Sequence, residues 1–370
     1  MTILAVIILL QTFLMLWLFF CGNAAAAKQQ IMSTESTSDD VIDVIITARE
    51  EYEVIEQAIL SFENLQVHSI ILALDHPSEK LLTQLTHLPT THCIKTIINQ
   101  GIPGKINTQK LGLQSACSQN VLIMDADIKV AITQRDFSRM VRCFINSSSD
   151  FFCPYSFGIY SHLNIWAWIA DCDRTMRQQI VRAGRDYYGI SNLSGYFLLA
   201  KRERYIQVID SNYLQDDVVA TINLFKNELS VRTYHHVVCG ELERNSFYKS
   251  LMQRIRWTAG NLLVYPKYIE IFRGIGVRKG VVFTLSSHLW YTSLYCDFLA
   301  YVLCWKQPIL FYCLLLEIIV KSIILSQRKS GTVDFICHII YSVVWPIFST
   351  IALLGVIPYL IFKLERESRR

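Results

Sequence analysis

The stretch Leu122–Val130, LIMDADIKV, is the part of the chain from which the fold is best deduced. It joins a short apolar run, typical of a buried strand, to two aspartates in D-x-D spacing, Asp125 and Asp127. Two carboxylates directly after a strand can lie on one side of a turn, where their oxygens suit a hard divalent cation such as Mg²⁺. Turns also favour Asp for purely structural reasons. The pair therefore indicates a metal site only together with the other motifs of the sequence.

Similar apolar runs alternate with helical patterns on the N-terminal side of this stretch. Such β-α-β alternation predicts an α/β domain with a mostly parallel sheet, in which ligands bind at the carboxyl ends of the strands. Asp75 directly follows the second predicted strand, so we expect it at the same edge as Asp125 and Asp127. The predicted strands are 41–47, 69–74, 93–98 and 121–124, and the predicted helices are 51–62 and 106–118.

Two further motifs follow in the C-terminal half of this domain. LQDDV, Leu214–Val218, contains the paired carboxylates of Asp216 and Asp217 near an expected helix start, where an acidic residue also serves as a helix cap. QRIRW, Gln253–Trp257, lies in a basic helical segment. Its amide, guanidinium and indole lie within about one helical turn and suit phosphate oxygens and a stacked ring. Taken alone, this second cluster is typical of an amphipathic surface helix.

The two ends of the chain are strongly apolar. Four segments, 1–27, 281–304, 307–326 and 335–362, hold 99 residues but only three charges, whereas the other 271 residues hold 63. The sequence therefore describes an ordinary soluble domain with membrane-spanning ends. The net charge of +4 is too small and scattered to indicate a nucleic-acid partner. Eleven cysteines without a C-x-x-C pair are expected to be reduced thiols in a cytoplasmic domain.

The first apolar segment, 3–20, is expected to be an uncleaved anchor. A signal peptide is the alternative, since Ala24–Ala27 offers small residues for cleavage. However, no positive charge precedes the apolar run, and Lys28 follows it. The positive-inside rule then places the domain after Lys28 in the cytoplasm, on a plasma or inner membrane.

The C-terminal apolar segments are expected to begin with a helical hairpin, 281–304 and 307–326. Asp297, Glu317 and Lys321 are costly in lipid and should face protein or a polar cavity, with Glu317 and Lys321 ion-paired one turn apart. The loop Gln327–Thr332, which carries Arg328 and Lys329, should lie inside. The last segment is either a span or re-entrant, because a span would put Arg366, Arg369 and Arg370 outside.

Taken in order, these motifs resemble the membrane-integrated family 2 glycosyltransferases, which include cellulose, chitin, hyaluronan and poly-N-acetylglucosamine synthases and, more distantly, ceramide glucosyltransferases. The resemblance covers about residues 41–260. It rests on DVIITAREE with Thr47 and Glu50, on Asp75, on Gly104–Lys105 followed by Asn107, on Asp125-Ala126-Asp127, on Asp216–Asp217, and on Gln253/Arg256/Trp257. Departures from the family pattern are Thr47 in place of Pro, and His76 and Pro77 in place of Asp and Gly.

The resemblance implies a GT-A catalytic domain that binds a UDP-sugar. Nucleotide-sugar contacts would come from Asp75, Lys105, Asp125, Thr47 and Glu50. Asp127 and Asp125 would hold Mg²⁺ or Mn²⁺ against the diphosphate. Asp217, with Asp216 beside it, would be the general base of an inverting displacement. Arg256 would stabilise the diphosphate, Gln253 and Trp257 would contact the acceptor, and Gly195 would form an acceptor-side turn.

The implied product is a β-linked polysaccharide or oligosaccharide. Two alternatives stay open: transfer of a single sugar to a lipid, and a non-catalytic membrane subunit that retains the fold. A homo-oligomer or an accessory subunit is also left open. The expected organisation is an anchor over 1–27, a linker over 28–40, the GT-A domain over 41–245, interfacial helices over 246–280, transmembrane helices over 281–362 and a charged tail over 363–370.

Overall fold

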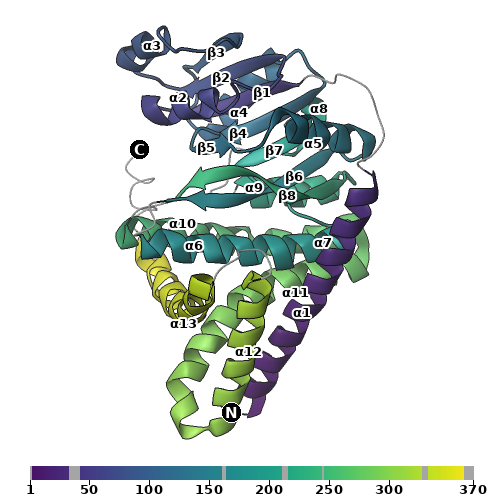
Figure 1. Cartoon of the computed structure of the whole chain (residues 1–370), viewed down its shortest axis with the longest axis vertical. Helices are drawn as coiled ribbons and strands as arrows, with labels where there is room; N and C mark the ends of the chain where they lie inside the picture. Colours follow the sequence, from purple (N-terminus) through teal and green to yellow (C-terminus); the bar gives the residue numbers. More distant parts are fainter. Residues whose placement is uncertain are drawn as a thin grey trace.

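Eight strands form one mixed sheet in the computed structural model (Figure 1), which describes residues 2–32, 42–160, 164–210, 216–243, 246–326 and 332–361. The strand order is β3-β2-β1-β4-β7-β6-β8-β5. β1 to β4 are parallel, β7 is antiparallel to β4 and β6, and β8 runs parallel to β6. The strands are β1 Asp43–Ala48, β2 Ser69–Asp75, β3 Ile94–Asn99, β4 Asn120–Asp125, β5 Ile128–Val130, β6 Phe151–Ile159, β7 Phe197–Lys201 and β8 Val231–Leu242.

Helices cover both faces of the sheet. Alternate residues of each strand point to opposite faces, so Val44 and Ile46 pack into one core with α2 and α5, while Ile45 packs into the other with α4 and α9. The helices of this part are α2 Tyr52–Leu60, α3 Glu79–Leu85, α4 Lys105–Ser115, α5 Gln134–Asn146, α8 Arg202–Val208 and α9 Asp216–Lys226.

A second layer of helices lies between the sheet and the apolar end of the molecule (Figure 1). One continuous helical stretch is built from α6 (Ile165–Met176), a π-helical segment η1 (Arg177–Arg182) and α7 (Ala183–Tyr187). Beside it runs α10 (Phe247–Val264), which continues through the 3₁₀ turn η2 (Tyr265–Lys267).

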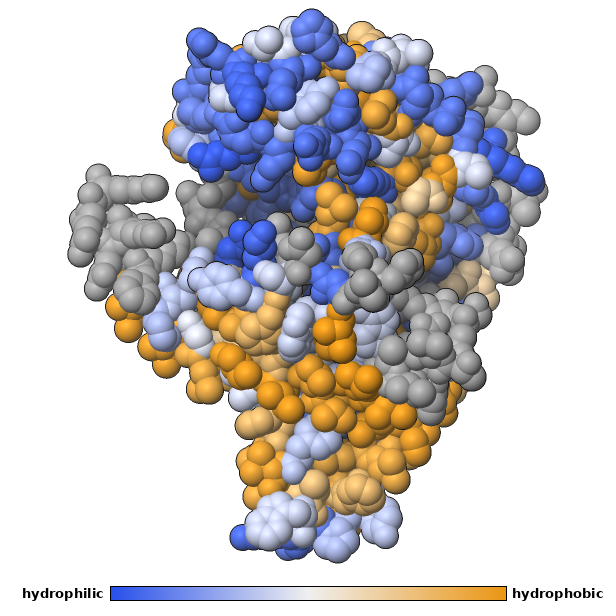
Figure 2. Space-filling model, turned by 60° about the vertical axis from the view of Figure 1, so that its left-hand side comes forward, coloured by the Kyte–Doolittle hydropathy of each residue, from blue (hydrophilic) through white to orange (hydrophobic). Residues whose placement is uncertain are grey.

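The remaining helices are long and apolar. They are α1 Thr2–Met32, α11 Tyr268–Leu303, the 3₁₀ turn η3 Cys304–Lys306, α12 Pro308–Ser326 and α13 Thr332–Leu354. In the described residues, three segments are long and apolar enough to cross a membrane: Ile3–Gln29, Pro308–Ser326 and Ile339–Ile361. The expected span 281–304 forms the second part of α11 and is not one of these three. Figure 2 shows one face of the molecule, with hydrophobic residues gathered over the apolar helices above a small hydrophilic tip, and with mostly hydrophilic residues at the sheet end.

The predicted strands and helices of the N-terminal half are confirmed. β1 to β4 and α2 and α4 match their predicted ranges to within a few residues, and α11, η3 and α12 form the predicted helical hairpin. α1 runs to Met32, into the expected linker. The rest of that linker (Ser33–Asp40), Leu214 and Gln215 of LQDDV, Arg328 and Lys329 of the inside loop, and the arginines of the tail lie outside the described residues.

The charged side chains of the hairpin face one another, as the sequence predicts. Lys321 Nζ lies 2.9 Å from Asp297 Oδ2 and 2.9 Å from Glu317 Oε1, and all three residues are buried. The group therefore joins α11 to α12 through an ion-paired cluster inside the apolar end of the molecule. The ten cysteines whose side chains the structure describes are free thiols, also as predicted.

Replacing the cation of this cluster should destabilise the protein. Lys321→Met leaves two buried carboxylates without a positive partner, so we expect the free energy of unfolding to fall by about 3–5 kcal/mol. Thermal unfolding of the purified protein in detergent measures this. Lys279→Met removes an exposed lysine of α11 and should change stability by less than about 0.5 kcal/mol. Equal melting of the two variants would contradict an ion-paired role for Lys321.

Candidate active site

A cavity of about 680 Å³ opens between the carboxyl end of β4 and the helices below the sheet. Its walls come from the N-termini of α4 and α9, the α6–η1–α7 stretch, α10 and the start of α11. Eleven of the residues singled out in the sequence line it: Gly104, Lys105, Asn107, Asp125, Asp127, Gly195, Asp216, Asp217, Gln253, Arg256 and Trp257. Motifs spread over 150 positions of the chain therefore meet at one site.

Lys105 is the central cation of the acidic end. It is the first residue of α4, and its Nζ lies 2.8 Å from Asp125 Oδ1, 2.9 Å from the Gly195 carbonyl oxygen and 3.6 Å from Asp216 Oδ2. Gly195, expected to form an acceptor-side turn, thus holds Lys105 through its backbone. A Cβ at position 195 would lie 3.4 Å from Asp217 Cβ, an ordinary van der Waals contact, so Gly195 stands directly beside Asp217.

The aspartates of the cavity differ in their proton affinity. Burial raises the pKa of Asp125 to about 7 against the opposing charge of Lys105, and Asp127 raises it further. Burial and the neighbouring Asp216 carboxylate raise the pKa of Asp217 to about 6, again opposed by Lys105. A carboxyl with a pKa near 6 is ionised at neutral pH and binds a proton more readily than an ordinary Asp, as a general base requires.

Asp216 and Asp217 begin α9, as the sequence predicts. The backbone N–H of Asp217 donates to Asp216 Oδ1 (3.1 Å), and that of Val218 donates to Asp217 Oδ1 (2.9 Å). The Thr221 hydroxyl donates to the Asp217 carbonyl oxygen (2.7 Å) one turn later. These contacts fix Asp217 at the N-terminus of the helix, where the helix dipole favours its charged form.

Thr47, Glu50 and Asp75 are not part of the cavity lining, in contrast to the other predicted residues. Thr47 pairs with Asp125 across β1 and β4, and its buried hydroxyl has no hydrogen-bond partner within the described residues. The Glu50 carboxylate accepts from the backbone N–H and the hydroxyl of Ser78, both at 2.9 Å. These three residues lie along the neighbouring strand ends, beside the cavity.

Asp75 is bound to the loop that leads into α4. Its Oδ2 accepts from the Gly104 N–H (3.1 Å), and its Oδ1 accepts from Asn99 Nδ2 (3.2 Å) and lies 3.0 Å from His76 Nδ1. His76, which departs from the family pattern, adopts a φ of 51°, a backbone region that few residues other than glycine occupy. The imidazole of His76 lies within hydrogen-bond distance of the Asp75 carboxylate.

A row of arginines on the α6–η1–α7 stretch forms the wall opposite the aspartates, and sequence reasoning missed it. Arg174, Arg177, Arg182 and Arg185 all line the cavity, within three helical turns. Their spacing in DRTMRQQIVRAGR was the available signal. Arg177 and Arg182 are the first and last residues of the π-helical segment η1, and such segments are frequent at functional sites.

Carboxylates neutralise the first part of this row. Arg174 forms ion pairs with Asp171, Glu241 and Glu243. Asp173, buried behind the wall, pairs with Arg177 (2.9 Å) and with Arg254 of α10 (2.8 Å). Those two arginines hold the pKa of Asp173 below its ordinary value although burial opposes this.

Trp257 occupies the junction between α10 and the arginine wall. The guanidiniums of Arg177 and Arg254 lie 5.8 and 5.3 Å from the centre of its ring, within the range of cation–π contacts. These contacts hold the indole, which lines the cavity, between α10 and the arginine wall.

The donor set of the acidic end suits a divalent cation that is shared with a substrate. The described residues contain no group of three or more His, Cys, Asp or Glu side chains arranged as a metal site. Asp125 and Asp127 nevertheless both face the cavity, and Mg²⁺ in nucleotide sites is typically held by one or two carboxylates together with substrate phosphates. The two carboxylates therefore fit a cation whose remaining ligands come from a diphosphate.

Comparison with solved structures identifies the fold. The chain superposes on a mannosyltransferase from Pyrobaculum calidifontis, solved with GDP-Man and Mn²⁺, with a TM-score of 0.52 and 12% sequence identity over 88% of this chain and 100% of that one. Glucosyl-3-phosphoglycerate synthase from Mycobacterium tuberculosis, solved with Mn²⁺, UDP and its product, matches at 14% identity over 64% and 82% of the two chains. The TM-score of this second match is 0.40.

No protein-family model and no curated protein matches the sequence. The fold is that of the GT-A class, a mostly parallel sheet with helices on both faces, here combined with apolar helices that are long enough to cross a membrane.

Proposed function

We propose that this protein is a membrane-bound inverting glycosyltransferase of family 2 that takes a hexose from a nucleotide sugar, UDP-linked in our proposal. The observation that carries the proposal is the meeting of Asp125, Asp127 and Asp217 with Arg256 and Trp257 around one cavity. The mannosyltransferase with the same fold was solved with a nucleotide sugar and Mn²⁺, which supports a donor and a cation of this kind.

In this mechanism Asp125 and Asp127 act on the donor, whereas Asp217 acts on the acceptor. Asp125 and Asp127 hold Mg²⁺ or Mn²⁺, which when bound stabilises the charge that develops on the leaving diphosphate. Lys105 and Arg256 add positive charge on the same cavity, and Lys105 exchanges its ion pair with Asp125 for the diphosphate when the donor binds. Asp75, Thr47 and Glu50, at the adjoining strand ends, contact the nucleoside.

Asp217 acts on the acceptor. Its carboxylate removes the proton of an acceptor hydroxyl while that oxygen attacks the anomeric carbon and the bond to the diphosphate breaks. Asp216 supports Asp217 by raising its pKa. Displacement from the opposite face inverts the anomeric centre, so an α-linked donor gives a β-linkage. Gln253 and Trp257 orient the acceptor, with the indole stacked on a sugar ring.

Two kinds of acceptor fit the cavity. A growing β-linked polysaccharide is the first, because Trp257 offers a stacking face for the last sugar. A lipid that receives a single sugar is the second. It is favoured by the outer faces of α10 and α11, where Leu262, Leu263 and Ile269 are more than half exposed beside the cavity wall. In both cases the domain lies on the cytoplasmic side of a plasma or inner membrane.

The activity should depend on the ionisation of Asp217. The pKa of Asp217 is raised to about 6, and only the ionised carboxylate accepts a proton. We therefore expect kcat/KM to rise with pH through about 6 and to level off above it. Initial rates of UDP release in buffers of constant ionic strength measure this profile. A rate that stays flat from about pH 5 to about pH 8 would contradict the assignment.

A panel of radiolabelled UDP-sugars on membranes that express the full chain tests the proposal as a whole. We expect one donor to yield a labelled product that is absent from membranes without the protein. Long saccharide ladders identify a polymerase, and one labelled lipid species identifies single transfer. Failure of every nucleotide sugar to release its nucleotide would favour a non-catalytic subunit that retains the fold.

A further inference from the structure

We infer that the acceptor is a membrane lipid with a phosphate group between its reacting hydroxyl and its apolar chains, and that Arg182 and Arg185 bind this phosphate. The inference rests on the proposed function, because it names the acceptor class of the same cavity. It starts from the second half of the arginine row, which differs from the first half in its partners.

Arg182 is a buried guanidinium in contact with neutral oxygens. It is 7% exposed, lines the cavity, and donates to the Pro154 carbonyl oxygen (3.3 Å) and the Tyr196 hydroxyl (3.2 Å). No ion pair to a carboxylate joins it within the described residues. A buried charge that forms no ion pair at contact distance is costly, so the site is suited to an anion that arrives with a ligand.

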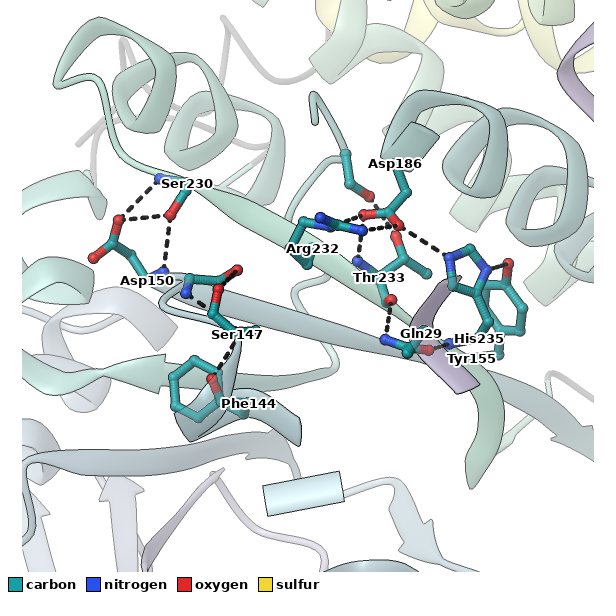
Figure 3. Close-up of polar contacts among 12 residues, drawn as sticks. Gln29, Phe144, Ser147, Asp150, Tyr155, Asp186, Ser230, Arg232, Thr233 and His235 are labelled. Atoms are coloured by element: carbon teal, nitrogen blue, oxygen red, sulfur yellow. Dashed lines mark hydrogen bonds and ion pairs between the residues drawn. The ribbon is translucent and has the colours of Figure 1, made fainter. Parts of the chain in front are cut away.

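The acidic residue nearest to Arg182 in sequence, Asp186, is already neutralised by other groups. Figure 3 shows its carboxylate between Arg232 (3.0 and 3.3 Å), the Thr233 N–H (2.8 Å) and His235 Nε2 (3.0 Å). His235 in turn contacts the Tyr155 hydroxyl at 2.9 Å. Asp186 therefore closes a network with β8 and is not a partner for Arg182.

Arg185 extends the basic site toward the apolar end of the molecule. Its guanidinium donates to the Ser286 hydroxyl (2.7 Å), the Phe283 carbonyl oxygen (3.1 Å) and the Ser287 hydroxyl, all on α11, and it lies 4.0 Å from the centre of the Phe283 ring. It is 5% exposed and also lines the cavity. Val281 and Leu285 of the same part of α11 are 40% and 47% exposed, so apolar surface adjoins the basic site.

The positions of these groups match the parts of one molecule. Arg182 and Asp217 line the same cavity, so an anion at Arg182 and a hydroxyl at Asp217 can belong to the same headgroup. Guanidinium groups suit phosphate oxygens in shape and charge. The acyl chains of a phospholipid would then continue along the exposed apolar residues of α11, Val281 and Leu285, into the bilayer.

The chemistry balances without a further reactant. The headgroup hydroxyl oxygen forms a bond to the anomeric carbon, the bond from that carbon to the donor diphosphate breaks, and the hydroxyl proton passes to Asp217. The nucleoside diphosphate leaves, and the phosphate of the lipid is unchanged throughout.

The test uses the full chain in phosphatidylcholine nanodiscs with the donor that shows the fastest UDP release in the absence of an acceptor. Phosphatidylinositol or phosphatidylglycerol is added in one arm, diacylglycerol or ceramide in a second, and glycerol phosphate in solution in a third. We expect transfer to the hydroxylated phospholipids, at a rate at least about 10-fold above that to neutral lipids, since a charged hydrogen bond is lost with the latter. Glycerol phosphate should be a poor acceptor because it has no apolar chains.

Arg182→Gln keeps hydrogen-bond donors for Pro154 and Tyr196 but removes the charge. It should lower kcat/KM for the phospholipid about 10- to 100-fold, mainly through KM. Arg204→Gln, on α8 and outside the cavity lining, is the matched control and should keep full activity. If Arg182→Gln does not fold, binding to the wild-type protein is measured without donor. We then expect phosphatidylglycerol to bind more tightly than diacylglycerol.

Three results would overturn the inference: equal use of neutral lipids, equal use of soluble glycerol phosphate, or a loss of UDP binding in Arg182→Gln that assigns the arginine to the donor. Absence of basal UDP release with every donor would instead reject the proposed function.

Discussion

Asp217→Asn should reduce sugar transfer by about 10²- to 10⁴-fold, the usual contribution of a general base. The amide keeps the size of the side chain and can still accept the Val218 N–H, so the start of α9 should stay intact. UDP binding should be nearly unchanged, because the base acts on the acceptor. Single-turnover transfer and UDP titration measured on the same preparation separate the two effects.

Glu203→Gln is the matched control for this variant. Glu203 is an exposed residue on α8, outside the cavity lining, and its loss of charge should leave transfer unchanged. Wild-type turnover in Asp217→Asn would remove Asp217 as the base, and a parallel loss of UDP binding would indicate that it serves the donor.

Removal of divalent cations should stop the reaction. After dialysis against EDTA we expect transfer to fall to background, and addition of Mn²⁺ or Mg²⁺ should restore it. Asp127→Asn should lower transfer about 10²- to 10³-fold, the range found when one charge-stabilising contact is lost in an active site. The affinity of Mn²⁺ for the UDP complex, measured by paramagnetic resonance, reports the metal role apart from turnover.

Asp136→Asn provides the corresponding control, because Asp136 lies in the first turn of α5 away from the cavity. It should bind Mn²⁺ as the wild type does. Undiminished transfer in excess EDTA would contradict the role given to Asp125 and Asp127.

The first half of the sheet was predictable from the sequence because its order follows local patterns. β1 to β4 are short apolar runs separated by helices, and parallel strands joined in this way pair with near neighbours. β6, β7 and β8 follow no such rule. β7 lies antiparallel between β4 and β6, and β6 contains Pro154, so their arrangement depends on contacts that are distant in sequence.

The acidic half of the site was predictable for the same reason: Asp125, Asp127 and Lys105 lie at strand and helix ends that the alternation predicts. The arginine wall was not. Its residues lie within one helical stretch that is interrupted by a π-helical segment, and no strand-end or helix-end pattern in the sequence marks them as residues of the cavity. Thr47, Glu50 and Asp75, which the family motifs assign to the nucleotide sugar, lie at strand ends beside the cavity and outside its lining, so their assignment stays a prediction.

The first helix has a consequence for how this protein can be handled. Gln29, near the end of α1, bonds the Thr233 carbonyl oxygen (3.0 Å) and the His235 N–H (2.9 Å) in the network of Figure 3. Gly22 and Gly184 bring α1 and α7 so close that an added Cβ at either would lie within 2.7 Å of the other helix.

The part of the protein that contains the sheet is therefore expected to need α1 for its structure. A truncated form that starts after Met32 would lose the helix that supports the wall carrying Arg182 and Arg185. Expression for structural or enzymatic work should keep the chain whole, in detergent or nanodiscs, and a tag belongs at the C-terminus rather than in place of α1.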